Sequence, residues 1–152
     1  MFTDPFGLKA DTVEYASSAV KKGAEGCAQA SKTCAQQLSA LQNDPSKWLV
    51  KFGSLPGHRT GNTNTQGYAN QVTGGTITID PSHFGVASKD LGVTVNFNTT
   101  FGHELGHANG NIEIANTTGS LGPMNHCDEK CANIVENKVR TELGLPLLTP
   151  KP

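Results

Sequence analysis

The segment that decides the fold is Asn98–Gly110, which reads NTTFGHELGHANG. Its apolar residues Phe101, Leu105 and Ala108 recur at i, i+4 and i+7, so the pattern predicts a helix that directs these three side chains toward a core. The polar run that opens the segment supplies an N-cap, and the Asn-Gly pair that closes it predicts the C-terminal end. One helix with a buried apolar stripe is therefore expected at the centre of the protein.

Two histidines and a glutamate lie on this expected helix as an H-E-x-x-H pattern, residues 103–107. Because residues four apart stand one above the other, His103 and His107 can both reach one Zn²⁺ at about 2.0–2.1 Å. Glu104 lies one position round the helix, beside the open side of the metal. Zinc lowers the pKa of a bound water toward about 7, and Glu104 can take the proton and pass it to a leaving amine. The pattern predicts a zinc hydrolase with Glu104 as its catalytic acid and base.

Strands and a second helix are expected on either side of this segment. Thr76–Ile79 and Val93–Phe97 alternate apolar and polar residues and are rich in β-branched side chains, which predicts two strands. After a polar loop, a last helix is expected over Asp128–Leu143, ended by Gly144 and Pro146. A small sheet combined with separate helices predicts an α+β fold.

The N-terminal part of the chain predicts a long helix. Apolar residues recur there at spacings of three and four, with Ser31 at the one skipped position, namely Val13, Ala16, Val20, Ala24, Cys27, Cys34, Leu38 and Leu41. We expect one helix over residues 11–42, with Gly23 and Gly26 marking where it would bend. Ser46–Phe52 is expected to form a short helical turn, and Gly53–Gly75 is expected to be a loop.

Size and charge narrow the function classes. The chain has 152 residues and a mass of 16.0 kDa, which suits one compact domain. Its net charge is −1 and its longest basic run is Lys21-Lys22, so nucleic acid is not an expected partner. No apolar run approaches the roughly 20 residues of a membrane span, and no signal peptide opens the chain. Any export is therefore expected to use another route.

The four cysteines lie in two parts of the chain, Cys27 and Cys34 on the first expected helix and Cys127 and Cys131 on the last. Their three possible disulfide connectivities cannot be ranked from the sequence. In a regular helix residues seven apart are separated by about 10.5 Å along the axis, so a bond between Cys27 and Cys34 would need a broken helix. The alternative is four reduced, buried thiols. That alternative is favoured because Cys27 and Cys34 lie on the apolar stripe.

The order of strand, H-E-L-G-H and later helix with a carboxylate resembles the zincin metallopeptidases, over about residues 75–146. This resemblance implies a zincin-like fold, a His/His/carboxylate zinc site and a substrate strand along the sheet edge. Residues 129–133, EKCAN, are similar to the thermolysin-type third-ligand motif. The likeness implies Glu129 as third ligand, and Asn133 as the side chain that orients a zinc-binding histidine.

Two other carboxylates are alternative third ligands. Residues 103–113 are similar to the metzincin pattern with Glu113 in place of the final histidine, and Met124 could then form the Met-turn. Glu136 shares a face of the last helix with Glu129. Because Arg140 lies at i+4 from Glu136, an ion pair on the helix surface is the favoured interpretation of Glu136.

Residues 4–8, DPFGL, resemble the D-P-x-G-L that ends the core of Rhs/YD-repeat proteins. Residues 136–146 are similar to the ends of toxin peptidases released from such cores. The resemblance implies that residues 1–8 are a remnant of the cleavage motif, cut after Leu8, and that residues 9–152 are a zincin-like toxin domain. It further implies secretion into the cytoplasm or periplasm of a target cell. The implied partners are a protein or peptide substrate, the parental Rhs core and a cognate immunity protein.

Three functions remain open at this point. The first is a zinc-dependent metalloendopeptidase, with His103, His107 and Glu129 as ligands. The second is a zinc amidase or peptidase acting on peptidoglycan stem peptides, which oxidised cysteines would favour because disulfides persist in the periplasm. The third is a binding module in which zinc only stabilises the fold. Structural zinc sites usually have four protein ligands, mostly cysteine, whereas H-E-x-x-H leaves a position open.

Overall fold

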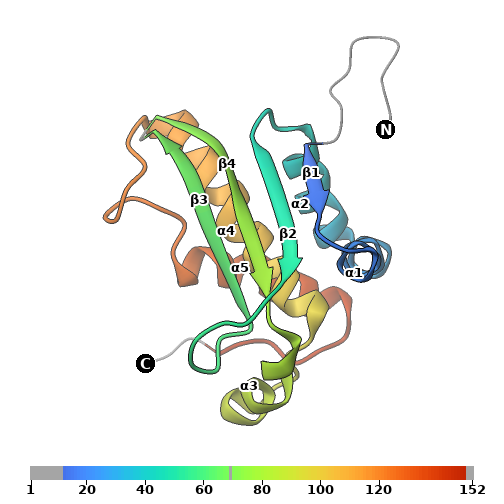
Figure 1. Ribbon diagram of the computed structural model, residues 1–152. Helices are drawn as coiled ribbons and strands as arrows, with labels where there is room; N and C mark the ends of the chain where they lie inside the picture. The colour runs from blue at the N-terminus through green and yellow to red at the C-terminus, as the bar shows by residue number, and fades with distance from the viewer. Residues whose placement is uncertain (1–11, 69, 150–152) are drawn as a thin grey trace.

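The computed structural model describes residues 12–68 and 70–149. In this part of the chain, four strands form one mixed sheet in the order β1-β2-β4-β3 (Figure 1). The strands are β1 (Val13–Tyr15), β2 (Lys47–Phe52), β3 (Gly61–Tyr68) and β4 (Gln71–Ile79). β2 pairs in parallel with β1 and β4, and β3 pairs antiparallel with β4. β3 therefore lies at one edge of the sheet.

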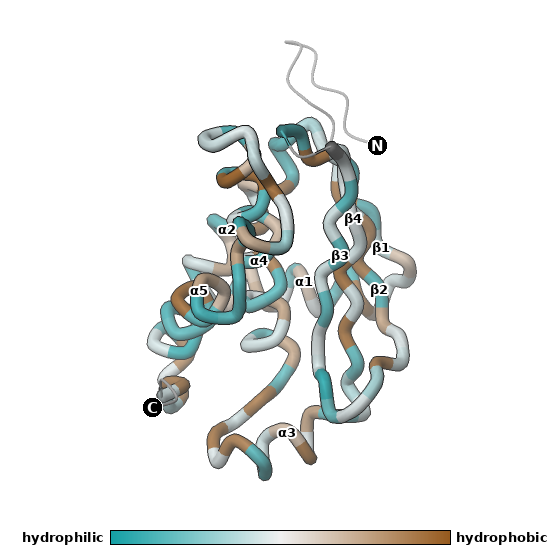
Figure 2. Tube along the Cα trace, turned by 90° about the vertical axis from the view of Figure 1, so that its left-hand side faces the viewer, coloured by the Kyte–Doolittle hydropathy of each residue, from teal (hydrophilic) through white to brown (hydrophobic). Residues whose placement is uncertain are grey.

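Five α-helices accompany the sheet within the described residues, so the fold is α+β as expected. They are α1 (Ser18–Ala30), α2 (Lys32–Asn43), α3 (Phe84–Leu91), α4 (Phe97–Thr118) and α5 (Glu129–Glu142), and the 3₁₀ turn η1 (Pro81–His83) precedes α3. Figure 2 shows α1, α2, α4 and α5 on one side of the sheet. No helix among the described residues is long and apolar enough to cross a membrane.

The core lies between the sheet and α4. Trp48 and Val50 of β2 and Ile77 and Ile79 of β4 are buried in one cluster with the apolar residues of this helix. The α4 residues expected in the core, Phe101, Leu105 and Ala108, are also fully buried, which confirms that expectation. Because α4 contacts both the sheet and α5, the H-E-x-x-H segment is held from two sides.

The prediction of a single helix over residues 11–42 is wrong, because the segment forms β1, α1 and α2. The break is at Ser31, whose backbone is extended and whose hydroxyl accepts a hydrogen bond from the Cys34 N–H. A serine side chain that caps the next helix in this way competes with continuation of the first helix. The Cys27–Cys34 disulfide spans this break, and Cys127 is bonded to Cys131, so the reduced-thiol interpretation is also wrong.

Two further expectations for the N-terminal half are wrong. Residues 46–52 contain strand β2 instead of a helical turn, because buried Trp48 and Val50 alternate with more exposed neighbours between β1 and β4. Residues 53–75 contain β3 and the first part of β4 instead of a loop. β3 has no apolar pattern because it is an edge strand, held mainly by its backbone pairing with β4.

The strand expected over residues 93–97 is absent, because Asn96 caps α4 and the helix begins at Phe97. The helix also continues past Asn109 and Gly110 to Thr118, where Gly119 adopts a left-handed conformation with φ of 67°. The Asn109 side chain donates to the Gln37 carbonyl at 2.8 Å, so tertiary contacts hold this part of the helix.

The remaining sequence predictions have mixed outcomes. Thr76–Ile79 lies in β4, and the last helix matches α5 with Asp128 as its N-cap, so both predictions are confirmed. The DPFGL segment, residues 4–8, lies outside the described residues. The resemblance to Rhs proteins therefore stays a prediction.

Candidate metal centre

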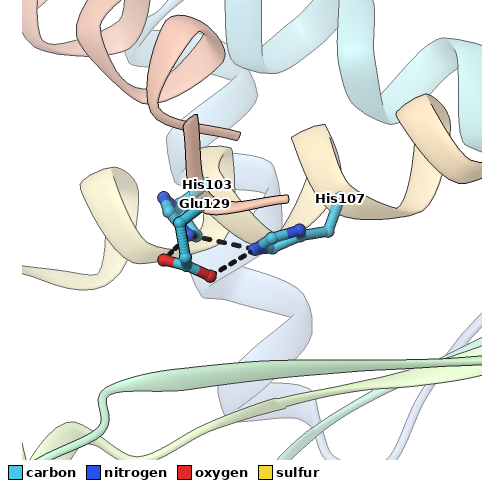
Figure 3. Close-up of side chains that lie close together, drawn as sticks. All are labelled: His103, His107 and Glu129. Atoms are coloured by element: carbon cyan, nitrogen blue, oxygen red, sulfur yellow. Dashed lines mark hydrogen bonds and ion pairs between the residues drawn. The ribbon is translucent and has the colours of Figure 1, made fainter. Parts of the chain in front are cut away.

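Three side chains converge where α4 meets the start of α5 (Figure 3). The Nε2 atoms of His103 and His107 lie 3.2 Å apart. The two carboxylate oxygens of Glu129 lie 3.0 Å from His103 Nε2 and 2.9 Å from His107 Nε2. Their donor atoms lie within 4.8 Å of one another, so this group could hold a metal ion. The structure thus brings together the three residues that the sequence pointed to as ligands.

The spacing of these atoms suits a single ion of the size of zinc. Two ligands bound tetrahedrally at about 2.0–2.1 Å stand about 3.3 Å apart. The separations here are 2.9, 3.0 and 3.2 Å, so only a small outward movement is needed to admit the ion. Two imidazoles and one carboxylate are also a donor set of catalytic zinc sites, which keep their fourth position open.

The other ring nitrogen of each histidine is held by a hydrogen-bond acceptor. His107 Nδ1 donates to the Cys127 carbonyl at 2.6 Å, and His103 Nδ1 donates to Glu136 Oε1 at 2.9 Å. When both rings are neutral and carry their protons on Nδ1, both Nε2 lone pairs face each other and the Glu129 carboxylate. Three acceptors in contact repel one another unless a cation lies between them, so the arrangement fits a metal ion.

The electrostatics of the group also favour positive charge. Burial alone would lower the pKa of His103, but hydrogen bonds with Glu129 and Glu136 outweigh it and raise the pKa to about 10. Burial likewise opposes a rise at His107, yet its hydrogen bond with Glu129 raises the pKa of this imidazole. Hydrogen bonds from the two histidines hold the pKa of the Glu129 carboxyl well below its usual range. The carboxylates around the two rings thus favour positive charge at this point, carried either by protons on the rings or by a metal ion.

Glu104 lies beside this group and is only 4% exposed. Burial raises the pKa of its carboxyl above the ordinary 4.5, and the nearby His103 imidazole and the Thr63 hydroxyl oppose part of the rise. A raised pKa suits a carboxylate that takes and returns a proton near neutral pH. Glu104 therefore has the surroundings expected of a general base.

The expected position of Glu136 on the helix surface is wrong. Its ion pair with Arg140 exists, at 2.7 Å, but it is buried instead of lying on the helix surface. Arg140 is 0% exposed and also donates to the backbone carbonyls of Thr94 and Pro146. The signal in the sequence was the seven-residue spacing from Glu129, which places Glu136 on the helix face that meets His103.

The other candidate residues are not part of the group. Glu113 is exposed on α4, and Met124 is 98% exposed. Asn133 lines the same groove as the histidines, but among the described residues it makes no hydrogen bond with either ring. Glu136 and the Cys127 carbonyl hold the rings instead, so the role expected of Asn133 is filled elsewhere.

A groove of about 1340 Å³ gives access to the group. One wall comes from the stretch that leads into β3, with Arg59 and Thr60, and from β3 itself. The opposite wall comes from α5 and the chain after it, and α3 closes one end. Apolar side chains lie on this surface, with Leu91 and Ile134 more than half exposed. Both polar and apolar side chains therefore line the groove.

No known family, curated protein or solved structure matches the chain. The fold and the site are therefore the basis for assigning a function. Together they define an α+β protein with a His/His/Glu group that could hold a metal ion, next to a buried glutamate in an open groove.

Proposed function

We propose that this protein is a zinc-dependent metalloendopeptidase with a zincin-like arrangement of sheet edge, H-E-x-x-H helix and ligand-bearing helix. The observation that carries the proposal is the convergence of His103, His107 and Glu129 within 4.8 Å, with the buried carboxylate of Glu104 beside them. A structural zinc site would be closed by four protein ligands, whereas this group supplies three and faces a groove.

In this proposal each residue has a definite task. His103, His107 and Glu129 hold the ion, which when bound supplies Lewis-acid chemistry for the attack of water on an amide. Glu104 accepts a proton from the attacking water and donates it to the leaving amine. Strand β3 offers the backbone groups of an edge strand to an extended peptide in the groove.

The proposal is tested by metal content and by cleavage of a denatured protein substrate. Wild-type protein should hold close to one zinc per chain. Glu104→Gln should keep the zinc and cleave only at a small residual rate, and His103→Ala should lose both the zinc and the cleavage. Glu113→Gln is the matched control, because it changes an exposed carboxylate of the same helix. Protein that neither holds nor gains zinc would overturn the proposal. If the protein is toxic to a target cell and Glu104→Gln is equally toxic, a binding module stabilised by zinc would be favoured.

We further propose that the peptidase is a toxin domain released from an Rhs-like protein and delivered into a target cell. The support is the DPFGL sequence at residues 4–8 together with the peptidase-like site. Expression behind a parental Rhs core, followed by N-terminal sequencing of the released fragment, should give Lys9 as the first residue. An uncut fusion would count against the Rhs origin and leave the zinc chemistry untouched.

A second candidate substrate is the stem peptide of peptidoglycan, and the two disulfides favour it. Cys27–Cys34 and Cys127–Cys131 are both bonded, and disulfides persist in the periplasm and not in the cytosol. The protein is expressed in bacteria with and without a periplasmic signal sequence. Growth arrest only with the signal sequence, together with altered muropeptides, would support this substrate. Arrest on cytosolic expression with intact muropeptides would exclude it.

A further inference from the structure

Strand β3 fixes the carboxylate of Glu104 from one side. The Thr63 hydroxyl donates a hydrogen bond to Glu104 Oε1 at 2.7 Å and lies 3.2 Å from the backbone carbonyl of the same residue. A hydroxyl has a single proton to donate, and the shorter contact with the carboxylate takes it. The expected general base is thus tied to the edge strand of the sheet, although 41 positions separate the two residues.

Gly61, two residues earlier on the same strand, makes room for the other carboxylate oxygen. A Cβ at this position would lie 2.7 Å from Glu104 Oε2 and 2.8 Å from Glu104 Cγ, and such contacts force atoms to move. It would also lie 2.8 Å from a methyl group of Thr100. Because side chains two apart on a strand point to the same face, Gly61 and Thr63 together define where both oxygens lie.

We infer that Thr63 and Gly61 are positioning residues for Glu104, with Thr63 occupying Oε1 and Gly61 leaving Oε2 open to the attacking water. The inference rests on the peptidase activity proposed above and assigns roles to two residues outside the H-E-x-x-H pattern. An oxygen that already accepts a hydrogen bond is the poorer proton acceptor, so the proton goes to Oε2. The O–H bond of the water breaks, its proton binds Oε2, and the remaining hydroxide oxygen bonds to the amide carbon while the π bond of the carbonyl opens and its electron pair moves onto the carbonyl oxygen. The C–N bond then breaks as Oε2 gives the proton to the leaving amine.

The decisive experiment is a double-mutant cycle on zinc-loaded protein with a fluorogenic peptide that the wild type cleaves. Thr63→Val removes the hydroxyl and keeps the shape of the side chain. It should lower kcat by about 10- to 100-fold and leave KM and zinc content unchanged, because misplacing a catalytic group costs rate and not binding. Thr63→Ser should restore most of kcat. In a Glu104→Gln background Thr63→Val should have no further effect.

Matched controls separate positioning from general stability. Thr73→Val changes an exposed threonine of the neighbouring strand β4, whose hydroxyl donates a hydrogen bond to the Gln66 carbonyl, so kcat should stay near the wild-type value. Gly61→Ala should lower kcat, whereas Gly85→Ala, where a Cβ meets nothing within 4 Å, should not. Equal losses in Thr63→Val and Thr73→Val, or an additive loss in the Glu104→Gln background, would overturn the inference.

Failure of the peptidase proposal can be distinguished from failure of the positioning inference. If zinc-loaded wild type cleaves no peptide, the peptidase proposal fails, and crystal structures of wild type and Thr63→Val then test the positioning role directly. The inference expects the Glu104 carboxylate to turn away from β3 in the variant. A carboxylate that stays in place without the hydroxyl would overturn the role of Thr63, whatever the protein does.

Discussion

Glu136 Oε1 accepts a hydrogen bond from His103 Nδ1 at 2.9 Å, and this contact joins α4 and α5, the two helices that carry the candidate ligands. The second oxygen of the same carboxylate lies 2.7 Å from Arg140 Nε. His103, Glu136 and Arg140 therefore form a buried chain that ends on backbone carbonyls. Such partners of metal-binding histidines fix the orientation of the ring and strengthen its binding.

We predict that Glu136→Gln weakens zinc binding about 10- to 100-fold, because a neutral amide supports the His103 ring less well than a carboxylate does. Competition with a chromogenic chelator measures the affinity. Glu113→Gln, on the exposed face of α4, should bind zinc like the wild type. Equal affinities of the Glu136 variant and the wild type would mean that the contact is structural only.

Arg140→Met should destabilise the fold by about 3–5 kcal/mol, because it leaves the Glu136 carboxylate buried without its cationic partner. Urea unfolding of the zinc-free protein measures the loss without a contribution from metal binding. Adding Glu136→Gln to Arg140→Met should recover part of the lost stability, since the buried charge is then gone. A smaller loss in Arg140→Met than in Glu136→Gln would contradict the prediction.

The third ligand is decided by a pair of variants. Glu129→Ala should lose zinc on dialysis against a mild chelator, because two histidines alone remain, whereas Glu113→Ala should retain it. Elemental analysis after dialysis gives the answer. The reverse outcome, with zinc lost only from Glu113→Ala, would support the metzincin-like arrangement instead.

Replacing both Cys127 and Cys131 with alanine should speed the release of zinc. These residues flank Glu129 in the sequence, the Cys127 carbonyl accepts from His107, and both sulfur atoms pack close to Gly110 of α4. The matched control is the double alanine variant of Cys27 and Cys34, which should unfold at a lower temperature and release zinc at the wild-type rate. Equal release rates in the two variants would contradict the prediction.

The Glu142 carboxylate should make stability depend on pH. It accepts hydrogen bonds from the hydroxyls of Ser31 and Thr33, both at 2.6 Å, and from the Thr33 N–H at 2.8 Å. Partial burial opposes the shift, but these bonds together lower the pKa of Glu142 below its ordinary value of 4.5. A lowered folded-state pKa adds stability that is complete above about 4.5 and is lost as the pH falls through the folded-state value.

Glu142→Gln should therefore unfold at a lower temperature than the wild type at pH 7, and the difference should shrink as the pH falls below about 4.5. Thermal unfolding followed by circular dichroism at a series of pH values measures it. Glu14→Gln, on the short strand β1, is a control without these hydrogen bonds. A difference between Glu142→Gln and wild type that is constant with pH would exclude the ionised carboxylate as its source.

The sequence alone was sufficient to predict those features that depend on the spacing of nearby residues. Phe101, Leu105 and Ala108 recur on one helical face, and two histidines four residues apart reach the same point whatever surrounds the helix. The cap of α5 at Asp128 is equally local, since it depends on a side chain and the N–H three residues later. These patterns predicted the central helix, part of its core and the histidines of the candidate site.

Only the tertiary structure decided the features that depend on distant partners. Ser31 ends α1 while its hydroxyl meets Glu142, 111 positions away, and β3 exists because its backbone pairs with β4. Glu136 and Thr63 contact His103 and Glu104 from other elements, 33 and 41 positions away. Backbone pairing leaves no side-chain pattern, and the burial of a polar residue depends on which elements pack against it. The sequence thus determined the chemistry of the candidate centre, and packing decided which residues orient it.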